Sequence, residues 1–429
     1  MDVVGPEDAE DRQRRMAGAL AAAGCRRGDR VAFWLPSSVD LLCAVLGAAR
    51  TGVIPVLLNA TLLPAERDRL IDDADPVLSV VDAASLAKLA DGPPVDLAPR
   101  PLTRPMHYTS GTTGFPKGVT TGLWDDGTAA AVFDDEADLW GFDRDDLHLV
   151  CSPMYHTVSI RFAAGTLLRG GSLAVLDHFD PATALDVLRR LRPTTTFMAP
   201  VHLQRLLALP ELGDGERFDS IRLLAHAGSP CPPVLKRAAM ARSDHVWEFY
   251  GSTEGQFTVC SPDEWLARPG TVGRARPGRR LTIADGTIWC HAPPFARFDY
   301  WRNPDATAAA WRGDAFTVGD LGHVDDDGYL YLSGRRDDLI ITGGVNVYPA
   351  EVEAALMEVD GVDEVAVIGV PDDTWGQRVV AVVVGTADLD DVCRAAADRL
   401  APYKRPKDYR RADGLPHTAT GKLIRRAVG

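Results

Sequence analysis

The chain has 429 residues, of which 46% are hydrophobic and 25% charged, as expected for an ordinary folded protein of two or three domains. Its net charge of −14 argues against a nucleic-acid-binding surface, although a local site can still be positive. The most apolar window, 41–60, contains Arg50, Gly52 and Pro55, so it predicts a buried helix, a turn and a strand rather than a membrane span.

The first part of the chain alternates predicted helices and strands. Ser37 and Ser38 offer hydroxyl caps to the helix that follows them. The β-branched apolar run at 52–58 is typical of a buried parallel strand. This alternation predicts a doubly wound sheet. The predicted elements are a helix at 11–23, strands at 30–35 and 52–58, a helix at 64–73 and a strand at 77–81.

The alternation resumes after a proline-rich loop at 91–105 and changes after Glu254. Short strands separated by Gly, Pro and Asp then run to about Tyr331, which predicts a small β-barrel or a distorted sheet. The last part, from about 337 to 429, has the size and pattern of a small α+β domain. The predicted elements are strands at 147–151, 172–176 and 194–199, helices at 159–168, 181–191 and 201–209, and, in the last part, helices at 349–358 and 388–400 with strands at 364–370 and 378–384.

The segment 107–119 combines residue types suited to a polyphosphate, with four aliphatic hydroxyls, three glycines and one lysine. Glycines let the backbone turn its N–H groups toward a ligand, hydroxyls add short donors, and a lysine supplies a point charge. Lys117 stands between Pro116 and Gly118, which excludes a Walker A loop, and a flexible polar turn is the alternative interpretation. The residues expected to contact phosphate are Thr109, Ser110, Gly111, Thr112, Thr113, Gly114 and Lys117.

This string resembles the phosphate loop of the acyl-adenylate-forming superfamily of AMP-binding enzymes, which includes acyl-CoA synthetases, non-ribosomal adenylation domains and luciferases. The resemblance implies an α/β fold, with a large N-terminal domain of doubly wound sheets plus a small β-barrel and a small mobile α+β C-terminal domain. We expect the N-terminal AMP-binding domain at 1–336 and the C-terminal lid domain at 337–429. The resemblance also implies that the chain uses ATP and Mg²⁺.

Two further blocks resemble the nucleotide motifs of the superfamily, in the same order. In the block 250–254, Tyr250 can stack on a purine and Glu254 offers a hard oxygen ligand for Mg²⁺. In the block 317–322, Asp320 can accept hydrogen bonds from both ribose hydroxyls. Taken alone, the two blocks also fit a turn with a surface glutamate and an Asp-rich hairpin turn. The first block adds Gly251 and Thr253 to the expected nucleotide site.

The block 333–349 resembles the interdomain hinge and the following β-turn of acyl-CoA synthetases. Non-ribosomal adenylation domains carry a different sequence here, so the block favours a CoA ligase. By resemblance, Arg335 binds ribose, Asp337 is the hinge and Gly344 lets the pantetheine arm of CoA pass. A plain linker between two strands is the alternative interpretation.

Three remaining blocks are expected around the reacting acid. The block 416–422 resembles the C-terminal motif of the catalytic lysine, Lys422, although a solvated basic tail is the alternative. The block 152–157 resembles the one that places a histidine or aromatic gate at the acyl pocket, and 226–230 resembles the loop over the adenine and the acid carboxylate. The expected nucleotide contacts here are Gly228 and Ser229, and the expected pocket residues are Tyr155, His156, Ala227, Gly228 and Gly251.

The favoured interpretation is an ATP-dependent acid–CoA ligase, similar to fatty-acid–CoA ligases. The acid attacks the α-phosphorus of ATP, pyrophosphate leaves, and after rotation about Asp337 the acyl group passes from AMP to the CoA thiol. No arginine or aspartate that would specify an amino acid is evident, which favours a hydrophobic acid. The expected catalytic residues are Lys422, Glu254, Thr112 and His156, and the expected metal ligands are Glu254 and Thr112.

Two alternatives stay open. One is an adenylating enzyme whose acceptor is a carrier-protein phosphopantetheine or another nucleophile. The other is a catalytically silent relative that only binds an acyl ligand or a nucleotide. The presence of Lys117, Glu254, Asp320 and Lys422 argues against a silent relative.

Composition also bears on location and partners. The seven cysteines are scattered without a C-x-x-C pair, which favours reduced thiols over a disulfide framework or a zinc site. The acidic, polar stretch 1–8 does not match a signal peptide. We therefore expect a cytoplasmic monomer or homodimer that binds a carboxylic acid, ATP and CoA, and neither nucleic acid nor a membrane. Compared with the superfamily, the chain starts close to the first helix and is short over 82–106, which shrinks the large domain without loss of a motif.

Overall fold

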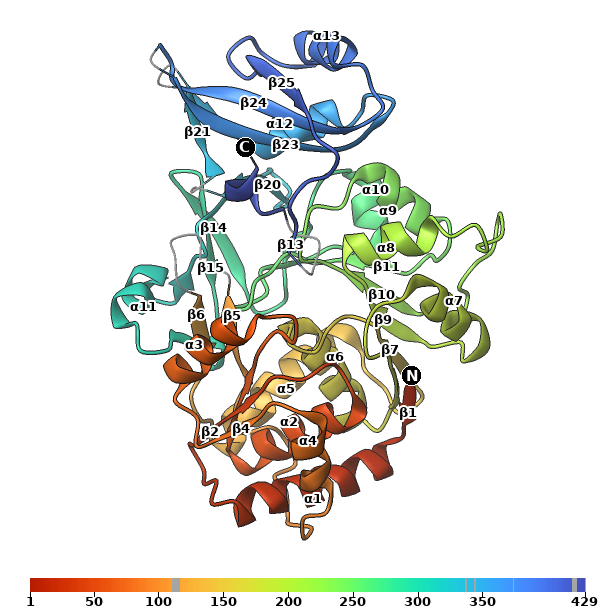
Figure 1. Cartoon of the computed structure of the whole chain (residues 1–429), viewed down its shortest axis with the longest axis vertical. Coiled ribbons are helices and arrows are strands. Elements are labelled where there is room, and N and C mark those ends of the chain that lie inside the picture. The colour runs from red at the N-terminus through yellow and green to blue at the C-terminus, as the bar shows by residue number, and fades with distance from the viewer. Residues whose placement is uncertain (110–115, 336–337, 343–344, 373, 419–422, 429) are drawn as a thin grey trace.

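The computed structural model describes residues 1–109, 116–335, 338–342, 345–372, 374–418 and 423–428. Figure 1 shows a large body, residues 1–335, and a smaller terminal unit, residues 338–428, which lies at one end of the body. Among the residues described, no helix is both long and apolar enough to cross a membrane. All seven cysteines are free thiols.

The first sheet of the body has the strand order β16-β6-β5-β3-β2-β4. Strands β2 to β5 are parallel, whereas β6 and β16 close one edge in antiparallel fashion. The hydroxyl of Ser38 caps helix α2 by accepting a hydrogen bond from the Leu41 N–H at 3.0 Å, as the serine pattern predicts. The elements are α1 (Pro6–Ala22), β2 (Arg30–Phe33), α2 (Val39–Thr51), β3 (Ile54–Leu57), α3 (Pro64–Ala74), β4 (Leu78–Val80), α4 (Ala83–Ala90), β5 (Met106–Thr109), β6 (Lys117–Thr120) and β16 (Asp299–Tyr300).

The second sheet has the order β1-β8-β7-β9-β10-β11 and is parallel except for β1 at its edge. Helices α2 and α6 pack between the two sheets, because their apolar side chains share one core cluster with β2, β7 and β8 (Figure 1). The elements are β1 (Asp2–Val4), α5 (Asp126–Trp140), β7 (Leu147–Val150), α6 (Thr157–Leu168), β8 (Ser172–Val175), α7 (Pro181–Arg190), β9 (Thr195–Phe197), α8 (Pro200–Leu207), β10 (Leu223–His226), α9 (Pro233–Met240) and β11 (Val246–Glu248).

The part predicted as a barrel or distorted sheet is a mostly short-stranded antiparallel sheet. Its order is β17-β18-β15-β19-β20, with β14 paired to β15. Its core contains several aromatic rings. The elements are β12 (Thr258–Val259), α10 (Pro262–Ala267), β13 (Arg274–Ala275), β14 (Arg280–Ala284), β15 (Thr287–His291), η1 (Pro294–Ala296), α11 (Pro304–Ala310), β17 (Trp311–Arg312), β18 (Ala315–Phe316), β19 (Asp320–Val324) and β20 (Leu330–Arg335).

The terminal unit is the small α+β unit that the sequence pattern predicts. Its sheet has the order β22-β21-β24-β23, with β25 parallel to β24. Helices α12 and α13 pack on this sheet through aliphatic side chains. The elements are β21 (Ile340–Thr342), β22 (Val345–Val347), α12 (Pro349–Leu356), β23 (Val362–Asp372), β24 (Gly376–Gly385), α13 (Leu389–Arg399), β25 (Asp408–Arg411) and η3 (Arg425–Ala427).

The structure differs from the predicted elements at a few places. Helix α1 begins at Pro6, earlier than the apolar periodicity indicates, because proline is favoured in the first helical turn. The additional elements include helices α4, α5, α9, α10 and α11 and strands β1, β10, β11 and β25. They are short, or they carry many charged and small residues, so their apolar pattern is weak.

Candidate active site

Thr109 and Lys117 mark the two ends of the predicted phosphate loop. Strand β5 ends at Thr109, β6 begins at Lys117, and the two residues pair in the antiparallel ladder. The Thr109 hydroxyl donates to the Lys117 carbonyl across 3.4 Å. The sheet therefore fixes the positions of the two residues that flank the loop. The predicted phosphate ligands Ser110, Gly111, Thr112, Thr113 and Gly114 lie outside the described residues.

Lys117 and Glu254 lie on either side of one aromatic residue, Tyr300. The Lys117 Nζ lies 4.6 Å from the centre of the Tyr300 ring, a cation–π contact. The Tyr300 hydroxyl donates to the Glu254 Oε1 at 2.8 Å, and only 6% of Glu254 is exposed. Strand β16 brings Tyr300 here, because it pairs with β6 next to Lys117. A cation and a buried carboxylate, predicted for the same nucleotide site, are thus brought together.

The loop that carries Glu254 is a tight turn after β11. The Ser252 N–H donates to the Gly255 carbonyl at 2.8 Å, and Gly251 forms a bridge with Gln256. A Cβ at Gly251 would lie 2.9 Å from the Gln256 Cα, so a larger residue would force the backbone apart. The glycine is therefore required for the turn that aims Glu254 at Tyr300.

The predicted adenine and ribose motifs also meet. The Tyr250 hydroxyl donates to the Asp320 Oδ2 at 2.6 Å. Asp320 begins β19 and pairs in the ladder with Arg335, the last residue of β20. The backbone of Arg335 thus lies where the ribose motif predicts, and its side chain lies outside what the structure describes.

The residues predicted for the acid end lie at the start of α6 and after β10. The rings of Tyr155 and His156 are 4.3 Å apart. Burial lowers the pKa of His156 to about 4, and its Nε2 has no partner among the described residues. Gly228 follows Ala227 with a φ of +95°, a conformation that glycine adopts without strain. The contacts do not tie Gly228 or Ser229 to the Tyr250–Asp320 pair within the described part of the chain.

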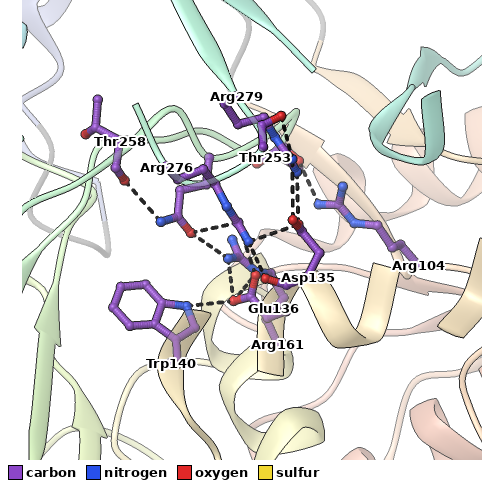
Figure 2. Close-up of polar contacts among 11 residues, drawn as sticks. Arg104, Asp135, Glu136, Trp140, Arg161, Thr253, Thr258, Arg276 and Arg279 are labelled. Atoms are coloured by element: carbon purple, nitrogen blue, oxygen red, sulfur yellow. Dashed lines mark hydrogen bonds and ion pairs between the residues drawn. The ribbon is translucent and has the colours of Figure 1, made fainter. Parts of the chain in front are cut away.

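A network of arginines and carboxylates adjoins the loop of Glu254 (Figure 2). Arg161 donates to the Glu136 Oε1 at 2.5 Å from Nη2 and 3.1 Å from Nε. Arg276 reaches Glu136 at 3.3 Å and the Asp135 Oδ2 at 2.9 Å. Burial alone would raise the pKa of Glu136, but the charges of Arg161 and Arg276 outweigh it and lower that pKa. Glu136 is therefore ionised at neutral pH.

The sequence did not indicate this network or Tyr300. Glu136 and Arg276 are 140 positions apart, and β16 has only two residues, so no local spacing marks either contact. Of the other predicted residues, Asp337, Gly344 and Lys422 lie outside the described ranges.

Comparison with known proteins places this geometry in a family. The sequence profile of AMP-binding enzymes matches residues 7–103 and 93–288, and that of the AMP-binding enzyme C-terminal domain matches residues 351–422. The long-chain-fatty-acid–CoA ligase FadD13 of Mycobacterium tuberculosis is 33% identical, over 96% of this chain and 90% of that protein. The 2-succinylbenzoate–CoA ligase of Geobacillus kaustophilus is also 33% identical, with the same coverage of both chains.

A solved structure agrees with the sequence relatives. The ATP-bound MatB of Rhodopseudomonas palustris superimposes with a TM-score of 0.86 at 32% identity, over 98% of this chain and 92% of that one. The similarity covers nearly all of each protein, including the body and the terminal unit. The chain therefore belongs to the AMP-binding enzyme family, in its acyl-CoA ligase-like branch.

Proposed function

We propose that the chain is an AMP-forming acid–CoA ligase, which activates a carboxylic acid as an acyl-adenylate and passes the acyl group to CoA. One observation carries the proposal: Lys117, Tyr300 and Glu254 form a contiguous cluster in a chain of the AMP-binding family. The Tyr250–Asp320 pair adds groups suited to a nucleoside. The side chains proposed to bind phosphate, metal and nucleoside therefore all belong to the body.

The first half-reaction converts a poor leaving group into a good one. A carboxylate oxygen of the acid bonds to the α-phosphorus of ATP, and the bond from that phosphorus to pyrophosphate breaks. Lys117, with Ser110 and Thr113, stabilises the departing pyrophosphate, because an ammonium lowers the energy of the growing negative charge. One unit charge at about 4 Å near a protein surface contributes roughly 4 kcal/mol, which changes a rate by two to three decades.

Glu254 fits a magnesium ligand. Its carboxylate offers hard oxygen atoms, and Tyr300 occupies only Oε1, while Oε2 has no donor among the described residues. We assign Mg²⁺ to Glu254 together with Thr112 or Thr109; when bound, the ion neutralises charge on the ATP phosphates. Groups of three or more His, Cys, Asp or Glu side chains suited to a metal are absent from the described ranges. A single protein carboxylate is sufficient where phosphate oxygens and water complete the shell.

The acid end is lined by Tyr155, His156, Ala227, Gly228 and Gly251. Burial lowers the pKa of His156 to about 4, so this residue is neutral at physiological pH and has no acidic proton to donate; we assign it to the wall of the acid site. Gly228 and Ser229 adjoin the adenine. The relatives named above act on a long-chain fatty acid and on 2-succinylbenzoate, so family membership leaves the acid open.

The terminal unit supplies Lys422 for the first half-reaction. Its ammonium bridges the acid and the α-phosphate, both of which are negatively charged. For the second half-reaction the unit rotates about Asp337, between domains 1–336 and 337–429, and Gly344 comes to the thiol channel. We propose a cytoplasmic location, because all seven cysteines are free thiols.

The Lys422→Ala variant tests this division of roles. We expect it to lose acid-dependent ATP–pyrophosphate exchange by about 10²-fold or more, while thioester formation from supplied acyl-adenylate and CoA continues. Gly344→Leu is the complementary variant, which should impair only the thiol step. Equal loss of both half-reactions in Lys422→Ala would contradict the two-conformation mechanism, and absence of AMP formation from any acid would contradict the function itself.

A further inference from the structure

The network in Figure 2 has more positive than negative charge. Its four arginines are Arg104, Arg161, Arg276 and Arg279, whereas its two carboxylates are Asp135 and Glu136. Arg161 is paired with Glu136, Arg276 with both carboxylates, and Arg279 with the Asp135 Oδ2 at 2.9 Å.

Arg104 is the exception in this network. One of its Nη2 N–H groups donates to the Thr253 carbonyl at 3.1 Å, and no carboxylate of the described residues forms an ion pair with it. Burial, aided by the nearby charge of Arg161, lowers the pKa of Arg104 to about 10, so it is still a cation at neutral pH. Its remaining N–H groups have no partner in the described part of the chain. None of these nitrogens is among the buried atoms that lack a partner, so they are open to water and to an incoming anion.

The position of Arg104 connects it to the proposed acid site. It precedes β5, the strand that ends at the phosphate loop, and it holds the carbonyl of the residue before Glu254. Arg161 extends from α6, and His156 is the N-cap residue of that helix. The charged groups that affect Arg104 are Arg161, Glu136, Glu254 and Arg276. Glu254 forms no ion pair with Arg104, and we have assigned it to the metal.

We propose that Arg104, backed by Arg161, binds the distal carboxylate of the acid, and that the substrate is therefore a dicarboxylic acid. This inference rests on the proposed ligase function and names its substrate class. A guanidinium offers paired N–H donors that match the two oxygens of a carboxylate. An incoming carboxylate also reduces the excess positive charge of the network. This proposal differs from the hydrophobic acid that the sequence favours, because a dicarboxylic acid carries a second charge at its distal end.

The test uses acids that differ only in the distal carboxylate: butyrate with succinate, hexanoate with adipate, decanoate with sebacate, and benzoate with terephthalate. AMP formation is measured with ATP, Mg²⁺ and CoA for the wild type, Arg104→Met, Arg104→Lys and Arg27→Met. Arg27 is the matched control, because its Nη2 also donates to one backbone carbonyl, that of Trp124, at 3.1 Å. It lies outside the network of Figure 2.

We expect the wild type to prefer at least one dicarboxylate over its partner by about tenfold or more in kcat/KM. Arg104→Met should reduce that ratio by about tenfold, chiefly through KM for the dicarboxylate, Arg104→Lys should retain part of it, and Arg27→Met should leave it unchanged. If Arg104→Met does not fold, the inference is tested by the kcat/KM ratios of the wild type and of Arg104→Lys.

Two results overturn the inference while the ligase function stands. One is a wild type that prefers the monocarboxylate in every pair. The other is an Arg104→Met variant that slows both members of a pair equally, as expected of a residue that only holds the Thr253 carbonyl. AMP formation from none of the acids overturns the proposed function instead.

Discussion

The body and the terminal unit bury different kinds of side chain. Among the described residues, every buried polar or charged residue except Thr342 belongs to the body. The core of the terminal unit is aliphatic, built by α12 and α13 on β23 and β24. The body thus holds charges in fixed positions before a ligand binds, as electrostatic stabilisation of phosphate chemistry requires. In the proposed mechanism, the terminal unit needs only a stable fold that carries Lys422.

One ion pair in each region allows the contribution of charged side chains to stability to be compared between the body and the terminal unit. Arg161 and Glu136 in the body have side chains that are 19% and 15% exposed. Arg425 and Glu353 in the terminal unit are 19% and 16% exposed. The two pairs are equally shielded from water, but Glu136 also neutralises Arg276, whereas Glu353 serves one arginine. At nearly equal exposure, the comparison therefore contrasts a carboxylate that pairs with two arginines with a carboxylate that pairs with one.

The largest expected effect on stability is that of Glu136→Gln. Removing this charge leaves Arg161 without a carboxylate partner and Arg276 with Asp135 alone, and we expect the free energy of unfolding to fall by about 3–5 kcal/mol. Glu353→Gln should cost only about 1–2 kcal/mol, because Glu353 pairs with one arginine, Arg425, and Arg425 keeps Asp338 at 3.6 Å. Urea unfolding with a separate probe in each region measures both values.

Two results would contradict this expectation. Equal losses for the two variants would mean that the terminal unit depends on buried charge as strongly as the body. A loss below about 1 kcal/mol for Glu136→Gln would mean that water reaches the network and screens it. Either result would remove the contrast between the regions.

Acid should destabilise the body through its buried histidines. Burial lowers the pKa values of His107, His148, His156, His202 and His226, all of which lie in the body. A lowered pKa in the folded state means that the stability is complete above pH 6.5 and is lost as the pH falls from there toward the folded pKa. For His148, whose pKa burial lowers to about 3, the loss between pH 7 and pH 5 is about 2 kcal/mol.

The His148→Asn variant measures this contribution. The ring of His148 is buried with Nδ1 2.9 Å from the Thr195 Oγ1, and asparagine keeps a polar group there without a titrating one. The difference in unfolding free energy between pH 7 and pH 5 should be about 2 kcal/mol smaller than in the wild type. An unchanged difference would show that the folded protein accepts a proton on His148 at little cost. Hydrogen exchange at pH 5 should show loss of protection in the body first.

Local sequence was sufficient for most of the fold. The apolar run that contains β3 has no polar residue on either face, as a parallel strand between two layers requires, and Ser38 marks the start of α2. Strand β1 was not predicted because its partner, β8, is distant in sequence. Helix α5 was not predicted because its many carboxylates and alanines weaken the apolar pattern. Strand β1 exists only as an edge of β8, and the carboxylates of α5 are balanced by arginines after β13.

Only those residues of the candidate site that belong to a recognisable sequence motif could be predicted. Tyr250, Glu254 and Asp320 stand in recognisable blocks, and the structure brings Tyr250 to Asp320. Tyr300 and Arg104 stand outside every block, because their roles come from the pairing of β16 with β6 and from a contact with the Thr253 carbonyl. Pairing between distant segments leaves no periodic trace in either one. The residues missed are those that orient or surround the motif residues.

The smallest expected effect tests whether the body orients Glu254, the proposed metal ligand, before a ligand binds. Tyr300→Phe keeps the ring under Lys117 but removes the hydroxyl that donates to the Glu254 Oε1. Glu254 then keeps its charge and loses its orientation, so we expect acid-dependent ATP–pyrophosphate exchange to slow by about tenfold at saturating ATP. The control is Tyr108→Phe, which removes a hydroxyl that donates to the Asp73 Oδ2 at 2.6 Å and makes no contact with Glu254. It should slow exchange by less than about threefold. If the two variants slow exchange equally, the Glu254 carboxylate is oriented by the bound ligands and not by the body. The body and the terminal unit would then differ only in how much buried charge contributes to their stability.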